Sequence, residues 1–198
     1  MLTRSATTYF LAGLMATTSH ATASLCSPTE EVVFSCSSTT KTISLCASSD
    51  LSSSSGYMQY RLGTKAEIDL VFPEARVHPR GHFSQSSVSY SSGASSYLSF
   101  VNGHFRYLLY DVLVAKSPPQ IGHYHGVGVV VLRNALAVPI EAEWPTEAFV
   151  SILRCDPATV QHKWIPASEH IQRILEHEDF YYFPTQVIDA ILEERKWK

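Results

Sequence analysis

The stretch from Tyr97 to Tyr110 reads YLSFVNGHFRYLLY and is the strongest guide to the fold. Two aromatic-rich apolar runs flank Asn102-Gly103. An Asn-Gly pair between such runs is the strongest short-range signal of a β-hairpin. We therefore predict one strand over residues 97–101 and a second over residues 105–110.

Three further pairs of strand-like runs lie on either side of this hairpin. Most of them alternate apolar and polar residues with period two, which is typical of strands with one buried face. Eight strands joined mostly to their sequence neighbours predict a mainly β fold, an antiparallel hairpin meander that forms a barrel or a sandwich. The predicted pairs join 32–36 to 42–46, 57–61 to 67–72, and 128–132 to 136–138.

Segments rich in serine, proline and glycine separate the predicted hairpins. Serines are concentrated in residues 35–56 and 84–99, which we interpret as solvated loops that need no core. Residues 73–83 and 116–126 contain both Pro and Gly, and we interpret them as irregular connections.

The first 23 residues have the pattern of a secretory signal peptide. Arg4 supplies a positive charge, residues 9–16 form a short apolar core, and Ala21-Thr22-Ala23 is a small-residue cleavage site. We expect cleavage after Ala23 and export to the periplasm or the extracellular space. A buried N-terminal helix and a lipid anchor at Cys26 are the alternatives, and Leu25 opposes the anchor because a small residue normally precedes a lipidated cysteine.

The cysteines follow the predicted cleavage site and are even in number: Cys26, Cys36, Cys46 and Cys155. In an oxidising compartment this predicts two disulfide bonds, for which three pairings are possible. A zinc site is the alternative, although the sequence lacks the CxxC spacing typical of such sites.

After Cys155 the apolar residues follow a helical period. Ile171, Ile174 and Leu175 share one face of a predicted helix over 169–177, and a last helix after Pro184 carries its apolar stripe at Val187, Ile188, Ile191 and Leu192. We therefore divide the chain into a signal peptide (1–23), an antiparallel β domain (24–155) and a C-terminal helical extension (156–198).

Composition excludes several classes of protein. The 198 residues are 45% hydrophobic and 17% charged, with a net charge of -3. This apolar share argues against intrinsic disorder, and no apolar run reaches the length of about 18 residues that spans a bilayer. The negative charge argues against a nucleic-acid binder that relies on positive charge. We expect no transmembrane segment after signal cleavage and no nucleic-acid partner.

Three stretches, FSC at 34–36, KTISLCAS at 41–48 and GYMQYRLG at 56–63, resemble a family of small exported bacterial β-proteins of unassigned function. The resemblance spans about residues 26–155. It implies export and a β fold, and it transfers no catalytic residues.

A looser resemblance connects the segment SGASSY, residues 92–97, to the periplasmic inhibitors of C-type lysozyme. Those inhibitors are small disulfide-bonded β-barrels with a Ser-Gly-x-x-Tyr loop that enters the lysozyme cleft. The segment here has one residue too many.

No residue pattern specifies a catalytic site, so we assign no catalytic residue, metal ligand or cofactor. His123 and His125 would lie on one side of a strand, as in a metal-binding pair, and a histidine-rich metal site across two loops is the alternative to scattered surface histidines. His78, His82 and His104 are the other histidines in question.

Two carboxylates, Glu67 and Asp69, would share a strand face. They have the residue types needed to flank a glycosidic bond. The solvent side of an amphipathic strand is the alternative, with Ile68 and Leu70 facing inward.

The aromatic residues of the middle hairpins are either core or a binding surface. We place a binding site on Ser92, Gly93, Ser95 and Tyr97, because this segment leads into the most aromatic hairpin and carries no acid, base or cation. The chain is therefore interpreted as an exported, non-catalytic cell-envelope protein that binds a protein or a cell-wall glycan. An inhibitor of a cell-wall hydrolase and an envelope hydrolase are the alternatives.

Overall fold

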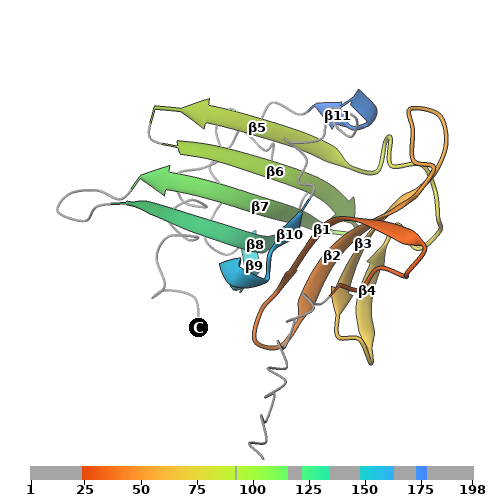
Figure 1. The fold of residues 1–198 in the computed structure, drawn as a ribbon, viewed down its shortest axis with the longest axis horizontal. Coiled ribbons are helices and arrows are strands. Elements are labelled where there is room, and N and C mark those ends of the chain that lie inside the picture. The colour runs from red at the N-terminus through yellow and green to blue at the C-terminus, as the bar shows by residue number, and fades with distance from the viewer. Residues whose placement is uncertain (1–23, 92, 116–121, 134–147, 163–172, 178–198) are drawn as a thin grey trace, which may run out of the picture.

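The computed structural model describes residues 24–91, 93–115, 122–133, 148–162 and 173–177. Within them, nine strands of at least five residues form two antiparallel sheets, sheet A and sheet B (Figure 1). Sheet A contains β1 (Glu30–Ser37), β2 (Thr42–Ser48), β3 (Met58–Gly63) and β4 (Ile68–Phe72). Sheet B contains β5 (Ser84–Tyr90), β6 (Gly93–Asn102), β7 (Phe105–Ala115), β8 (His123–Arg133) and β9 (Phe149–Arg154).

Within each sheet the long strands pair with their neighbours in the sequence, so the predicted hairpin meander is confirmed there, whereas β4 and β5 lie in different sheets. The order is β1-β2-β3-β4 in sheet A and β5-β6-β7-β8-β9 in sheet B. Short additions lie at two edges, where β10 (Gln161–His162) pairs with β1 and β11 (Glu176–His177) pairs in parallel with β5. A 3-10 turn, η2 (Pro157–Thr159), follows β9. The described strands do not close into a barrel, and the arrangement is sandwich-like.

The main core lies between the two sheets and results from the alternation of side chains along each strand. Its buried members from sheet A are Phe34, Ile43, Leu45, Met58 and Tyr60, and those from sheet B are Leu98, Phe100, Leu109, Val127 and Val129. The opposite face of sheet B has a second buried apolar cluster, which includes Tyr97, Leu108, Tyr110, Val112 and Val130. Sheet B is therefore apolar on both faces, whereas the outer face of sheet A is polar.

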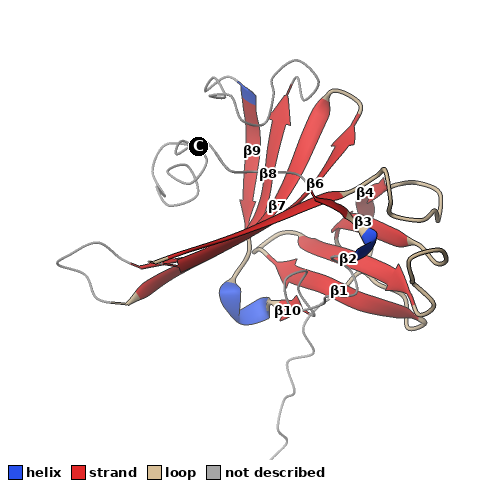
Figure 2. Cartoon of the chain, turned by 90° about the horizontal axis from the view of Figure 1, so that it is seen from above, coloured by secondary structure: helices blue, strands red, loops and turns tan. Residues whose placement is uncertain are grey.

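Sheet A covers only one end of sheet B, as Figure 2 shows. The other ends of β7 and β8 extend beyond it. Antiparallel pairing brings Tyr90, Gly93, Ala115 and His123 to this same end. We call this region the projecting end.

The sequence left three pairings of the cysteines possible, and the structure shows which one forms. Cys26 bonds to Cys46, which fastens the N-terminal segment to β2. Cys36 in β1 bonds to Cys155 after β9 and so joins the two sheets through the core. The prediction of two disulfide bonds is confirmed.

The serine-rich and irregular segments contain more strand than predicted. β5 and the first part of β6 occupy the predicted loop over 84–99, and β8 begins at His123 inside the predicted connection over 116–126. In β5 only Val88 is a β-branched apolar residue, and serine hydroxyls pair across the strands, with Ser87 Oγ 3.3 Å from Ser96 Oγ. The hydrophobic pattern therefore misses this strand. β9 was also not predicted.

The C-terminal helices are not confirmed. Glu176 and His177, at the end of the predicted helix over 169–177, form β11 instead. The predicted last helix, the signal peptide and the strand over 136–138 lie outside the described residues. No helix in the described part of the chain is long and apolar enough to cross a membrane.

Candidate functional site

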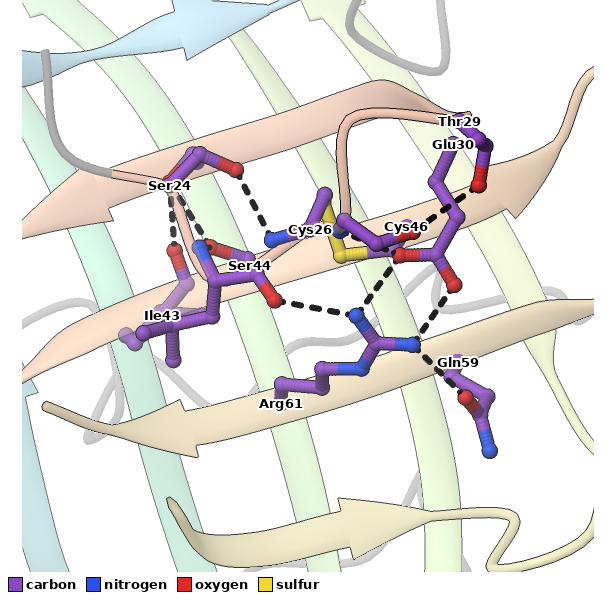
Figure 3. Close-up of a disulfide and its surroundings, with 12 residues drawn as sticks. Ser24, Cys26, Thr29, Glu30, Ile43, Ser44, Cys46, Gln59 and Arg61 are labelled. Carbon is purple, nitrogen blue, oxygen red and sulfur yellow. Dashed lines mark hydrogen bonds and ion pairs between the residues drawn. A yellow bond between two sulfur atoms is a disulfide. The ribbon is translucent and has the colours of Figure 1, made fainter. Parts of the chain in front are cut away.

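The outer face of sheet A carries a buried ion pair beneath the N-terminal segment (Figure 3). Arg61 donates to both carboxylate oxygens of Glu30 at 2.7 and 2.6 Å, and the Glu30 side chain is 1% exposed. The same guanidinium donates to the Leu25 carbonyl at 2.9 Å and to Gln59 Oε1 at 2.9 Å. Two-pronged pairing of this kind fixes both side chains in one orientation.

The Glu30 carboxylate is fully surrounded by donors. Burial alone would raise the pKa of Glu30, but hydrogen bonds from Arg61, the Ser27 amide and the Tyr57 hydroxyl outweigh it and lower the pKa from 4.5 to about 2. Glu30 therefore stays ionised at neutral pH and has no proton to exchange there. We interpret this network as a structural clamp and not as a catalytic acid.

Within the described residues, three side chains of types that can ligate a metal lie close together at the clamp. They are Cys26, Cys46 and the Glu30 carboxylate. The two sulfur atoms are bonded to each other, and only a thiolate is a good metal ligand. This group is therefore a disulfide beside a carboxylate, and we assign no metal to it.

The predicted binding segment begins at the projecting end and continues into the sheet. Ser92 lies outside the described residues, and Gly93 pairs with Val114 of β7. Ser95 is 3% exposed and Tyr97 is 2% exposed, the latter within the second apolar cluster. The structure therefore gives Ser95 and Tyr97 very little accessible surface, and the binding role of this segment stays a prediction.

The projecting end also brings His125 and Asp111 together. His125 Nε2 lies 2.8 Å from Asp111 Oδ1 at the surface of the sheet. Ser96 opposes Asp111 on β6, on the far side of β7 from His125. Since β6 and β8 are two strand spacings apart, about 9.5 Å, the imidazole cannot accept a proton from this serine. Ser96, Asp111 and His125 therefore do not form a Ser-His-Asp catalytic triad.

The second candidate region is a cavity of about 230 Å³ at the corner where sheet A meets the start of β5. We call it the corner cavity. Its aromatic lining is Phe72 and Phe100, and its polar lining is His82, Ser84, Ser99 and Arg106. It lies at the opposite end of sheet B from the projecting end.

The strand register explains why a cavity forms at this corner. β5 begins at Ser84, opposite Ser99, so β6 continues past the end of β5 from Phe100 to Asn102. Phe100 and Val101 line the cavity at this point. On β7, Arg106 directly opposes Val101 and donates to Ser99 Oγ at 3.4 Å. One strand end therefore places polar side chains beside the edge of the core, where Phe100 itself stays buried.

The remaining predicted candidates are separated from one another. His78 is held in a loop contact, with its Nε2 3.0 Å from the Ser52 carbonyl and its Nδ1 accepting from the Arg80 amide at 3.3 Å. His82 lines the corner cavity, and His104 is exposed in the β6–β7 turn. The described histidines do not form a group of three ligands with one another or with carboxylates.

The predicted carboxylate pair, Glu67 and Asp69, is also separated by its contacts. Asp69 forms an ion pair with Lys41 at 2.7 Å, and Glu67 is exposed in the turn before β4. Leu70 packs against the core, but Ile68 is 40% exposed, so the predicted inward orientation of Ile68 is wrong. A bulge beside Gly63 shifts the register there and breaks the alternation.

Sequence reasoning named His82 only as a possible metal ligand and missed Arg106, Ser84 and Ser99. A signal for Arg106 exists, since it alternates with Leu108 and Tyr110 on an otherwise apolar strand face. A charged residue at the end of such a face indicates a site where the apolar surface stops.

We compared the chain with protein-family models, curated proteins and solved structures, and none of them matches it.

Proposed function

We propose that the chain is an exported, non-catalytic binding module of the cell envelope, with a protein or a cell-wall glycan as its ligand. The observation that carries this proposal is the corner cavity, where aromatic and polar side chains share one small space. Ligand sites are usually concave and carry a few placed polar groups that fix the orientation of the ligand, and the polar side chains at this cavity can serve in that way. The two sheets that form it are joined by a disulfide bond, so its walls are held by a rigid frame.

Export is supported by the cysteines. Both disulfide bonds are formed, and no cysteine in the described residues is left free. Disulfide bonds persist in oxidising compartments and are rare in the cytosol of most organisms. This supports the predicted signal peptide and the resemblance to exported β-proteins, which remain part of the proposal.

An inhibitor of a cell-wall hydrolase is the second candidate, and one observation favours it. The turn between β5 and β6, next to Ser91 and Gly93, lies at the projecting end and beyond the cover of sheet A (Figure 1). A turn on a projecting sheet can enter the cleft of a partner enzyme. The envelope hydrolase is disfavoured by the arrangement of Ser96, Asp111 and His125 described above.

The proposed function is tested with the mature chain, residues 24–198, with both disulfides formed. It is mixed with purified insoluble cell wall and, separately, immobilised and exposed to envelope extract. We expect saturable sedimentation with the wall or retention of one identified envelope protein, and inhibition assays on lysozyme-type hydrolases test the second candidate. Failure to bind wall or protein, or turnover of a wall substrate by the chain itself, overturns the proposal.

A further inference from the structure

We propose that the free edge of sheet A, strand β4, pairs with the same strand of a second copy of this chain, so that two copies of sheet A join into one continuous sheet. This inference goes beyond the proposed binding function and does not depend on the corner cavity. It is carried by the unpaired edge of β4, by the lack of blocking residues within the strand, and by the match of the strand with itself.

Strand β4 is an edge of sheet A without a covering strand among the described residues. The other described edge of this sheet is covered, because β10 pairs with β1, and in sheet B β11 likewise covers β5. β4 pairs with β3 on one side, and no described strand pairs with its other side (Figure 1). None of its five residues is buried, and Ile68 is 40% exposed. A row of backbone N–H and C=O groups without a strand partner is a template for another strand.

The chain turns away from this edge where it continues beyond β4. Gln59 of β3 donates from its side-chain amide to the carbonyls of Pro73 and Glu74 at 2.8 and 3.1 Å. The Arg76 guanidinium lies 5.1 Å from the centre of the Tyr57 ring, next to the start of β3. These contacts hold the start of the connection to β5 on the β3 side of β4, away from the free edge.

The strand also lacks the features that usually prevent edge pairing. Such edges carry a lysine, a proline or a bulge that blocks the approach of another strand. The five residues of β4 read IDLVF and include neither lysine nor proline. The bulge beside Gly63 lies at the beginning of β4, and the strand stays in regular register with β3 from Leu70 to Phe72. Asp69 forms an ion pair with Lys41 at 2.7 Å, so an approaching strand does not meet an uncompensated charge.

A second copy of the chain matches this edge because the strand is complementary to itself. Antiparallel pairing that uses all five residues places Leu70 opposite Leu70 of the second copy, Ile68 opposite Phe72, and Asp69 opposite Val71. Apolar residues then meet apolar residues on one face, and on the other face no carboxylate lies directly opposite another. A two-fold axis through Leu70 makes both halves of the contact identical, as in most dimers. An extended segment of another protein could use the same backbone groups but need not carry this matched pattern.

The geometry also sets the size and the strength of the assembly. Within the described residues, sheet A offers one free edge per copy, so edge pairing ends at a dimer. A five-residue strand is far smaller than the roughly 20–30 residues a side of a standard stable interface, so we expect a weak dimer with a Kd of about 100 µM.

The test is sedimentation equilibrium of the disulfide-bonded chain over a concentration range from about 5 to about 500 µM, which brackets the expected Kd. We expect an equilibrium between monomer and dimer. Ile68→Lys places a charge opposite an apolar residue at both ends of the contact and should raise the Kd about tenfold. Val150→Lys is the matched control, because Val150 is 43% exposed on β9, an edge strand of the other sheet, and this variant should dimerise as the wild type does.

Hydrogen exchange on the wild type gives a second readout that does not depend on a variant. Backbone amides of β4 should exchange more slowly as the concentration rises through the Kd, whereas amides of β9 should not change. Thermal unfolding confirms that both lysine variants are folded before their association is compared.

Several outcomes overturn the inference: a monomer at every concentration, association that grows beyond a dimer, an unchanged Kd for Ile68→Lys, an equal loss of the dimer in Val150→Lys, or slowed exchange only outside β4. If the chain stays monomeric and the β4 amides become protected only when an envelope protein is bound, the edge takes another protein and not a second copy.

Discussion

Two regions of this molecule place an arginine among polar side chains on a β-strand, and they differ in what surrounds it. On the outer face of sheet A, Arg61 is 9% exposed and closes on the Glu30 carboxylate beneath the N-terminal segment. On sheet B, Arg106 donates to Ser99 and lines the corner cavity. In the first region the polar groups enclose one another beneath the N-terminal segment, and in the second they border a cavity.

This difference separates stability from binding. A buried charge that is held by a complete set of partners strongly penalises the loss of any one of them, so it fixes the structure around it. Polar groups at the rim of a cavity remain in reach of solvent, so the loss of one of them leaves less uncompensated charge. We therefore expect changes in the clamp to lower the free energy of unfolding, and changes at the cavity mouth to alter binding at nearly constant stability.

The disulfide that joins the two sheets has the largest expected effect. Replacing Cys36 and Cys155 by Ser opens a loop with a sequence separation of 119 and should lower the free energy of unfolding by about 4–5 kcal/mol. Replacing Cys26 and Cys46, with a separation of 20, should cost about 3 kcal/mol. Urea unfolding of the two double variants measures both losses, and a larger loss for the second variant would contradict the expected order.

Breaking the clamp itself comes next. Glu30→Gln leaves the Arg61 charge buried without its carboxylate and should cost about 3 kcal/mol in denaturant unfolding. Asp69→Asn is the matched control, because it breaks the Lys41–Asp69 pair, whose side chains are 37% and 35% exposed, and it should cost less than about 1 kcal/mol. If both variants lost the same free energy of unfolding, burial of the Glu30–Arg61 pair would not increase its contribution to stability.

The same carboxylate predicts an acid dependence. The pKa of Glu30 is lowered from 4.5 to about 2 in the folded protein, so its contribution is present above pH 4.5 and is lost as the pH falls from 4.5 towards 2. The contribution amounts to about 3 kcal/mol. The stability difference between wild type and Glu30→Gln should therefore shrink over this interval. A difference that stays constant down to pH 2 would contradict the assignment.

The smallest expected changes in the free energy of unfolding concern two tyrosines, Tyr57 at the clamp and Tyr60 in the core. Tyr57 donates to the ionised Glu30 at 2.7 Å, so Tyr57→Phe should cost about 1.5 kcal/mol. The Tyr60 hydroxyl is buried in the core and has no hydrogen-bond partner among the described residues, so Tyr60→Phe should be neutral or stabilising by up to about 1 kcal/mol. Thermal or urea unfolding of both variants checks the two signs, and a clear loss in Tyr60→Phe would contradict this account.

Local signals were sufficient where turn chemistry and alternation agree. The Asn102-Gly103 pair predicted the β6–β7 hairpin, and Gly103 has the positive φ of 60° that such turns require. The hairpins β1–β2 and β3–β4 were also predicted correctly from their alternation. In contrast, β5 is built largely from serine, so its strand pairing depends on β6 and on no hydrophobic pattern of its own.

The candidate site was predicted far less well, for a physical reason. The corner cavity combines Phe72, His82, Ser99 and Arg106, which come from β4, from the connection before β5 and from the β6–β7 hairpin, and they meet where β6 continues past the start of β5. The predicted binding segment was recognised by composition, which does not reveal burial. A side chain at Gly93 would also collide with the backbone carbonyl of Leu113, so bulk introduced there disturbs β7 before it reaches a partner.

The bond between Cys36 and Cys155 makes the greater part of the chain a covalent ring. Hydrolysis of any one peptide bond between these two residues opens the ring but releases no fragment. This connectivity means that a single cut by a protease leaves one molecule of unchanged mass apart from one added water. Such a nicked form would migrate as two pieces only after reduction, which makes a gel run with and without reductant a direct record of where the folded chain is accessible.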